Sequence, residues 1–246
     1  VKSLKDKHKI LLTDIKEPPN SYDGDFLKLS VDNLDGVIKA AEGMDCIVNL
    51  SVLRTDRKLA FDVSTKGNYS MMEAARINNI KRVINTGPHF QLVGQSYEEW
   101  DYNLNPDMPA QPGTRLYAIS KFLGQEICKR YADQFGIQLI TLLYYNMRHH
   151  LDLTTPDFEP AELHNDMTPF TTSWIDCGEA VRCAVDVSKE RLASNKETFF
   201  ISPNIPHKKF NSEKTYKVLG WQPRYTLENL WNKKIVSSDG HKEDSY

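Results

Sequence analysis

The 246 residues suffice for one large domain or for a domain with a small appendage, and a chain of this length buries a sizeable core. Hydrophobic residues make up 40% of the chain and charged residues 26%, which is ordinary for a globular protein, and no apolar run approaches the length of a membrane span. The formal net charge of −2 gives no reason to expect a nucleic-acid or anionic-membrane partner.

The first half of the chain alternates short apolar runs with segments of helical pattern. In the segment 32–41 the apolar residues fall at i, i+3, i+4 and i+7, which places them on one face of a helix. A second helix is predicted over 61–78. Strands are predicted at residues 10–14, 26–29, 46–50 and 82–86.

The second half continues the alternation less regularly. A polar loop at 95–113 precedes a long helix at 115–135, which ends at Gly136. Apolar residues predict a strand at 137–143, and the later elements are a helix at 177–188, a strand at 198–201 and a short helix at 212–219. The polar residues 237–246 are expected to be a disordered tail.

Strands that alternate with helices and are almost continuously apolar indicate an α/β fold. We expect a doubly wound parallel sheet with helices on both faces. The pattern loosens after Asn146, so we divide the chain into a sheet domain at 1–146, a small lobe at 147–236 interleaved with the last sheet elements, and the tail.

Cysteine usage points to a reducing compartment. The four cysteines form no Cys-x-x-Cys pair and have no histidine at ligand spacing, so we expect free thiols and no metal site. The N-terminus also lacks the pattern of a signal peptide. We therefore expect a cytoplasmic protein.

The candidate chemical centre is the pair Tyr117 and Lys121, at the start of the long helix. Residues four apart share one face of a helix, so the phenol and the ammonium can point into the same cleft. A neighbouring ammonium favours the phenolate form, which suits a general acid/base. An isolated Tyr-x-x-x-Lys is also common as an ordinary surface pair, so its context decides between the two interpretations.

The context resembles the extended short-chain dehydrogenase/reductase family, which contains NAD-dependent sugar epimerases, dehydratases and uronate dehydrogenases. Several segments match the family in its order: residues 42–50, Gly67 with Met72–Ala75, Lys81–Ile84, Tyr117–Gly124, and Leu219–Pro223, which reads Leu-Gly-Trp-Gln-Pro. The resemblance implies a Rossmann-like domain that binds NAD.

The same resemblance assigns roles to individual residues. It implies that Tyr117 is the general acid/base and that Lys121 hydrogen-bonds the nicotinamide ribose. Asp14, at the end of the first predicted strand, matches the acid that binds the adenosine ribose and that favours NAD over NADP; a turn aspartate is the alternative. Leu50 and Ser51 would line the cofactor.

Asn146, in the run Tyr144-Tyr145-Asn146, matches an asparagine that contacts substrate in the family's sugar-nucleotide epimerases. A loop asparagine that satisfies the backbone is equally open.

One position departs from the family's pattern. The family places Ser or Thr five residues before a glycine that follows the fifth strand, and counting back from Gly94 leads to His89. An imidazole can donate the same hydrogen bond to substrate and can shuttle a proton. Two alternatives stay open: a functional His89, with Thr86 as a less well placed substitute, or a His89 that only packs beside an impaired site.

A second departure concerns the phosphate-binding turn. The chain starts at Val1, and nothing ahead of Asp14 matches the family's Gly-x-x-Gly-x-x-Gly. In this fold the first strand lies at the centre of the sheet, and its neighbours would lack ladder partners without it. We therefore expect that a strand, a glycine loop and a half-helix, roughly 15–25 residues, precede the first residue.

These features predict an NAD-dependent oxidoreductase or epimerase that acts on a sugar or sugar nucleotide, with Tyr117 as its general acid/base. The alternative is a catalytically impaired relative with a nucleotide-sensing or scaffold role. Members of the family often pair through the helix that carries the Tyr and Lys, so the resemblance also implies a homodimer.

Overall fold

The computed structural model describes residues 1–93, 103–149, 170–204 and 209–226. The predicted tail at 237–246 lies outside these residues, as do residues 150–169, 205–208 and 227–236 of the predicted lobe at 147–236, and the proposed boundary at residue 146 stays a prediction. No helix in the described part of the chain has both the length and the apolarity needed to cross a membrane.

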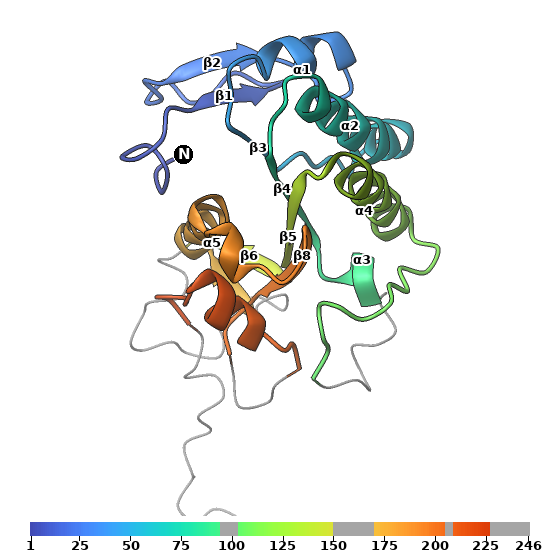
Figure 1. Cartoon of the computed structure of the whole chain (residues 1–246), viewed down its shortest axis with the longest axis vertical. Helices are drawn as coiled ribbons and strands as arrows, with labels where there is room; N and C mark the ends of the chain where they lie inside the picture. Colours follow the sequence, from blue (N-terminus) through green and yellow to red (C-terminus); the bar gives the residue numbers. More distant parts are fainter. Residues whose placement is uncertain (94–102, 150–169, 205–208, 227–246) are drawn as a thin grey trace, which may run out of the picture.

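The predicted alternation of strands and helices is confirmed (Figure 1). The elements, in chain order, are β1 (Leu11–Asp14), β2 (Asp25–Lys28), α1 (Leu34–Ala40), β3 (Cys46–Asn49), α2 (Arg57–Ile77), β4 (Arg82–Pro88), α3 (Phe90–Val93), α4 (Leu116–Phe135), β5 (Gln138–Tyr144), β6 (Asn146–Arg148), β7 (Thr171–Ser173), α5 (Trp174–Asp186), η4 (Lys189–Arg191), β8 (Lys196–Ile201) and η5 (Thr215–Leu219).

The strands are all parallel, as predicted, but they form three sheets rather than one. The main sheet has the order β3-β4-β5-β8, and β1 pairs with β2 in a separate two-stranded sheet. The short strands β6 and β7, which the sequence did not predict, form the third. Within the described residues β1 therefore pairs only with β2, and β3 only with β4.

Helices cover both faces of the main sheet, because successive residues of a strand point to opposite sides. Val83 and Leu139 pack with residues of α2 and α4, whereas their neighbours Ile84 and Ile140 pack with α5. Figure 1 shows α2 and α4 side by side on one side of the strands and α5 on the other. The two-sided core explains why the strands have almost no polar alternation.

Helix α2 begins four residues before the predicted start at residue 61. Asp56 caps it: its carboxylate accepts a hydrogen bond from the Leu59 N–H at 2.8 Å. The first turn begins with the charged residues Arg57 and Lys58, which carry none of the apolar period, so periodicity alone placed the start too late.

Helix α4 packs unusually close to α2. A Cβ on Gly124 would overlap the carbonyl oxygen of Ser64 and the side chain of Asn68, both on α2, so only glycine fits there. The helix ends as predicted at Gly136, whose φ of 66° lies in the left-handed region. The close approach brings the polar side chains of both helices against the end of β3.

The predicted C-terminal motif docks on α5. Trp221 is 1% exposed, and its indole N–H donates to the backbone carbonyl of Asp176 at 2.9 Å. The carboxylate of Asp176 accepts the backbone N–H groups of Arg224 and Tyr225. These contacts give the Leu-Gly-Trp-Gln-Pro segment a structural role.

Candidate active site

Tyr117 and Lys121 lie in the first two turns of α4, at the carboxyl edge of the main sheet. Arg115 is the N-cap, so the pair belongs to the regular part of the helix. Tyr117 is half-buried, and Lys121 is only 4% exposed. The predicted pair therefore shares one face of the helix, and that face is turned toward the protein rather than toward bulk solvent.

The ammonium of Lys121 is held by a backbone carbonyl. Its Nζ donates to the carbonyl oxygen of Ser51, just after β3, at 2.6 Å. Burial lowers the pKa of Lys121 from 10.5 to about 8; the nearby Cys128 thiol acts in the opposite direction, and the Arg54 guanidinium lowers the pKa further. Lys121 thus carries a charge that can be lost close to neutral pH.

Arg54, which no pattern in the sequence singled out, contacts the phenol of Tyr117. Its Nη2 donates to the Tyr117 hydroxyl at 3.3 Å, and its Cζ lies 4.6 Å from the centre of the ring. Arg54 therefore holds the hydroxyl and lies over the ring of Tyr117. The available signal was a basic residue in the loop directly after β3, where the cofactor was already expected.

His89 lies in a buried cluster of aromatic rings. It is 3% exposed, stacks on Tyr145 at 4.3 Å between ring centres, and meets Phe90 and Phe210 edge-on. The ring that contacts Tyr117 is that of Phe90, at 5.4 Å. This is the packing role that the sequence left open, and a hydrogen bond from His89 to substrate stays a prediction.

The two other predicted polar contacts are engaged with backbone groups. Asn146 is the first residue of β6, and its Oδ1 accepts the N–H of Met147 at 2.9 Å. The hydroxyl of Thr86 donates to the carbonyl oxygen of Asn49 at 2.8 Å. A substrate contact from Asn146 stays a prediction, and Thr86 is committed to linking β4 with β3.

The residues predicted to hold NAD lie at the carboxyl ends of parallel strands. Asp14 ends β1 with an exposed carboxylate, which accepts the N–H of Lys16 at 2.9 Å. Leu50, 60% exposed, and Ser51 follow β3 directly. An exposed acid for a ribose and a buried ammonium beside a phenol form a donor and acceptor set that fits a dinucleotide.

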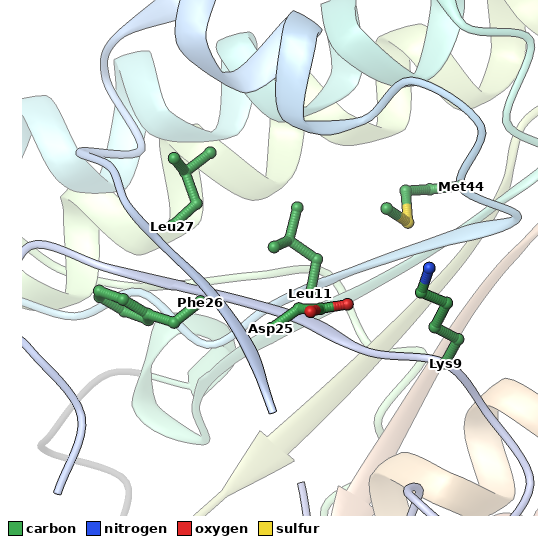
Figure 2. Close-up of a pocket in the computed structure, with 6 residues that line it drawn as sticks. All are labelled: Lys9, Leu11, Asp25, Phe26, Leu27 and Met44. Atoms are coloured by element: carbon green, nitrogen blue, oxygen red, sulfur yellow. The ribbon is translucent and has the colours of Figure 1, made fainter. Parts of the chain in front are cut away.

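A cavity of about 400 Å³ lies at the opposite edge (Figure 2). It is lined by Lys9, Leu11, Asp25, Phe26, Leu27 and Met44. Leu11 and Asp25 are the first residues of β1 and β2, so the cavity opens at the amino ends of the strands. It is separate from the Tyr117 site, and no cluster of metal-binding side chains occurs in the described ranges.

Comparison with protein families gives one match that covers most of the described sheet. The model of the NAD dependent epimerase/dehydratase family matches residues 2–148.

Curated relatives match only part of the chain. GDP-mannose 3,5-epimerase of Arabidopsis thaliana is 27% identical over 129 residues, which are 46% of this chain and 33% of the relative. Uronate dehydrogenase of Agrobacterium fabrum is 31% identical over 98 residues, which are 38% of this chain and 35% of the relative. The matched segments thus span about a third of each relative.

Solved structures share the fold over nearly the whole chain. A mutant of uronate dehydrogenase from Agrobacterium tumefaciens, complexed with NAD, superimposes with a TM-score of 0.72 at 18% identity, covering 93% of this chain and 80% of that one. UDP-glucose 4-epimerase from Thermotoga maritima, with UDP-glucose, gives a TM-score of 0.67 at 13% identity, covering 92% and 89%.

Proposed function

The chain belongs to the NAD dependent epimerase/dehydratase family, and on this premise we propose that it is an NAD-dependent oxidoreductase or epimerase acting on a sugar or sugar nucleotide. The observation that carries the proposal is the pair Tyr117 and Lys121 on the inward face of α4. The solved relatives support the substrate class, since one is a uronate dehydrogenase with NAD and another an epimerase with UDP-glucose.

Tyr117 is the proposed general acid/base. Its phenol oxygen takes the proton of a substrate hydroxyl as the carbon that bears it is oxidised, and it returns a proton in the reverse direction. Arg54 donates to this oxygen at 3.3 Å and would hold it in position for the transfer. When bound, NAD would accept a hydride, which would leave as NADH in a dehydrogenase and would return to the other face of the oxidised carbon in an epimerase.

The cofactor would be held by residues of the same edge. Asp14 would accept hydrogen bonds from the adenosine ribose, and its charge would oppose a 2′-phosphate, which would favour NAD over NADP. Leu50 and Ser51 would line the nicotinamide half, and Lys121 would bind its ribose. His89 is 3% exposed in its ring cluster, so the proposed hydrogen bond from its imidazole to substrate would require the ring to become accessible.

The proposed test removes one hydroxyl group. Tyr117→Phe is expected to abolish NADH formation with uronates or UDP-sugars, or the epimerisation of UDP- or GDP-sugars followed by NMR. The matched control is Tyr131→Phe on the same helix, whose hydroxyl donates to Glu73 at 2.8 Å, away from the site; this variant should keep its activity. Full activity in Tyr117→Phe refutes the proposal.

The cofactor is tested separately by mass spectrometry of the purified protein after denaturation. Bound NAD supports the cofactor assignment. Bound NAD without turnover of any of these substrates favours the nucleotide-sensing or scaffold alternative instead.

We also propose a homodimer formed through α2 and α4. Six large apolar side chains of these helices are more than a third exposed, namely Leu59, Phe61, Tyr69, Ile77, Leu123 and Phe135. Sedimentation equilibrium at micromolar protein is expected to give twice the chain mass, and Leu123→Asp is expected to shift the protein toward monomer. A monomeric wild-type protein contradicts the proposal.

A further inference from the structure

We infer that Asn49 is a positioning residue, which holds the Ser51 carbonyl against the Lys121 ammonium through a chain of buried amides. The inference rests on the proposed function, in which Lys121 serves the reaction, and it identifies a part of the core on which the reaction depends. Asn49 itself would touch neither substrate nor cofactor.

The chain begins in the middle of the main sheet. Asn49, Asn85 and Thr141 are register partners across β3, β4 and β5, so their side chains stand in a row on the face that α2 and α4 cover. Each is at most 4% exposed. A row of polar side chains across three buried strands is unusual, because buried polar groups destabilise a core unless they are hydrogen-bonded.

The side chains of this row are linked by a chain of hydrogen bonds in which each amide donates to one neighbour and accepts from the next. Gln125 on α4 donates to the Thr141 hydroxyl and accepts from Asn85 Nδ2 at 2.8 Å. Asn85 Oδ1 accepts from Asn49 Nδ2 at 3.0 Å, and Asn49 Oδ1 accepts the N–H of Ser51 at 3.0 Å. Each amide uses its NH₂ on one side and its oxygen on the other, so no amide can turn over without breaking two bonds.

A branch of the network ties α2 into the row. Asn68 Oδ1 accepts from the thiol of Cys128 at 3.1 Å and from Asn49 Nδ2 at 3.4 Å, while its amide donates to the Ser64 carbonyl at 2.5 Å. The close approach of α2 and α4 at Gly124 makes this branch possible.

The network closes into a ring at Lys121. Gln125 lies one helical turn after Lys121, and Lys121 donates to the carbonyl oxygen of Ser51. The N–H of the same residue, Ser51, donates to Asn49 and is the last link of the chain. Residues 50–56 between β3 and α2 have no regular secondary structure, so we attribute the orientation of Ser51 to the Asn49 side chain, which holds the N–H on one side of the Ser51 Cα while the carbonyl on the other side accepts from Lys121. Without it, the carbonyl that holds the ammonium can turn away.

The pKa of Lys121 should depend on its hydrogen bond to the Ser51 carbonyl. The titratable and charged groups that act on it are the Cys128 thiol on α4 and the Arg54 guanidinium from the loop after β3, which also donates to Tyr117 one helical turn before Lys121. None of these is changed by a substitution at Asn49. A loss of the Ser51 carbonyl removes a contact that favours the ammonium, so the titration of Lys121 should move to lower pH.

The test compares Asn49→Ala with Asn78→Ala. Asn78, at the far end of α2, donates to the carbonyls of Ile38 and Ala74, so its loss also removes two structural hydrogen bonds but lies away from Lys121. Hydrogen exchange followed by NMR should show the Ser51 amide exchanging about tenfold faster or more in Asn49→Ala only. The Nζ resonance of Lys121 should titrate at least about half a pH unit lower in that variant alone.

Activity provides a separate measurement. Asn49→Ala should lower kcat about tenfold or more while the KM for the sugar changes little, since the substrate contacts remain. If Asn49→Ala does not fold, Thr141→Val replaces it, since it keeps the side-chain shape and removes only the first link; it should show the same changes at smaller size. Equal Ser51 exchange, or an unchanged Lys121 titration, overturns the inference even if Tyr117→Phe is inactive as proposed.

Discussion

Replacing Lys121 by methionine should make the protein more stable at neutral pH while it removes the proposed activity. Lys121 is 4% exposed, and burial lowers its pKa from 10.5 to about 8. The difference between these values is worth about 3 kcal/mol, because one pKa unit equals about 1.4 kcal/mol. The folded state therefore carries this penalty whenever Lys121 is charged, and methionine does not.

Two smaller effects reduce the gain. Methionine leaves the Ser51 carbonyl without its donor, which costs about 1 kcal/mol or somewhat more, so the net gain at neutral pH is about 1–2 kcal/mol. Between pH 8 and 10.5 the unfolded wild-type chain binds more protons at this site than the folded one, so wild-type stability rises across this window. Near pH 10.5 only the lost Ser51 contact remains, and Lys121→Met becomes the less stable protein.

The assay is urea unfolding of both proteins at several pH values from neutral to pH 10.5, with the two free energies of unfolding subtracted. Subtraction cancels all other titrating groups. Lys129→Met is the matched control, because Lys129 lies on the same helix, is 33% exposed and pairs with Glu126 at 2.7 Å; it should show no gain. A difference for Lys121→Met that does not change with pH refutes the reasoning.

Three further substitutions test the packing that supports the site. Gly124→Ala should cost about 1–3 kcal/mol despite the better helix propensity of alanine, because its methyl group overlaps Ser64 across the helix contact, and an unchanged melting temperature would contradict the close approach. Asp176→Ala should lower the free energy of unfolding in urea by about 2–4 kcal/mol, since it leaves two backbone N–H groups after Trp221 without their acceptor. A change below about 0.5 kcal/mol would argue against this docking. Asp56→Ala should cost about 1 kcal/mol, and Asp56→Asn should restore most of it as an equally good N-cap.

The sequence predicted the elements of the fold well where hydrophobic periodicity controls them. The apolar strands and the long helix α4 lie within one or two residues of the prediction, because burial on both faces leaves a strong pattern. Helix α2 began earlier than predicted because a cap, not periodicity, sets its start. The short strands β6 and β7 were missed because three-residue strands carry too few residues for any period.

The site was predictable only to the extent that helical spacing defines it. Helical spacing predicted that Tyr117 and Lys121 lie together, because residues i and i+4 share one face of any α-helix, independent of the tertiary structure. Arg54 was not predicted because it lies in an irregular loop, where no period relates a residue's position in the sequence to the direction of its side chain. His89 was found by counting residues from a family pattern, which says nothing about the rings that bury it.

The row of buried polar side chains at Asn49, Asn85 and Thr141 has a signal in the sequence that hydrophobic periodicity does not detect. The segments Cys46–Asn49, Arg82–Asn85 and Gln138–Thr141 each have a polar side chain as the fourth residue, directly after two apolar ones. Once parallel pairing in register is assumed, these positions must lie side by side and must bond to each other or to the covering helices. The same helix face that presents Tyr117 and Lys121 to the site therefore continues, one turn later, into the core through Gln125. Since the two regions are joined by one helix and one ring of hydrogen bonds, substitutions deep in the sheet should alter the chemistry of Lys121 before they unfold the protein.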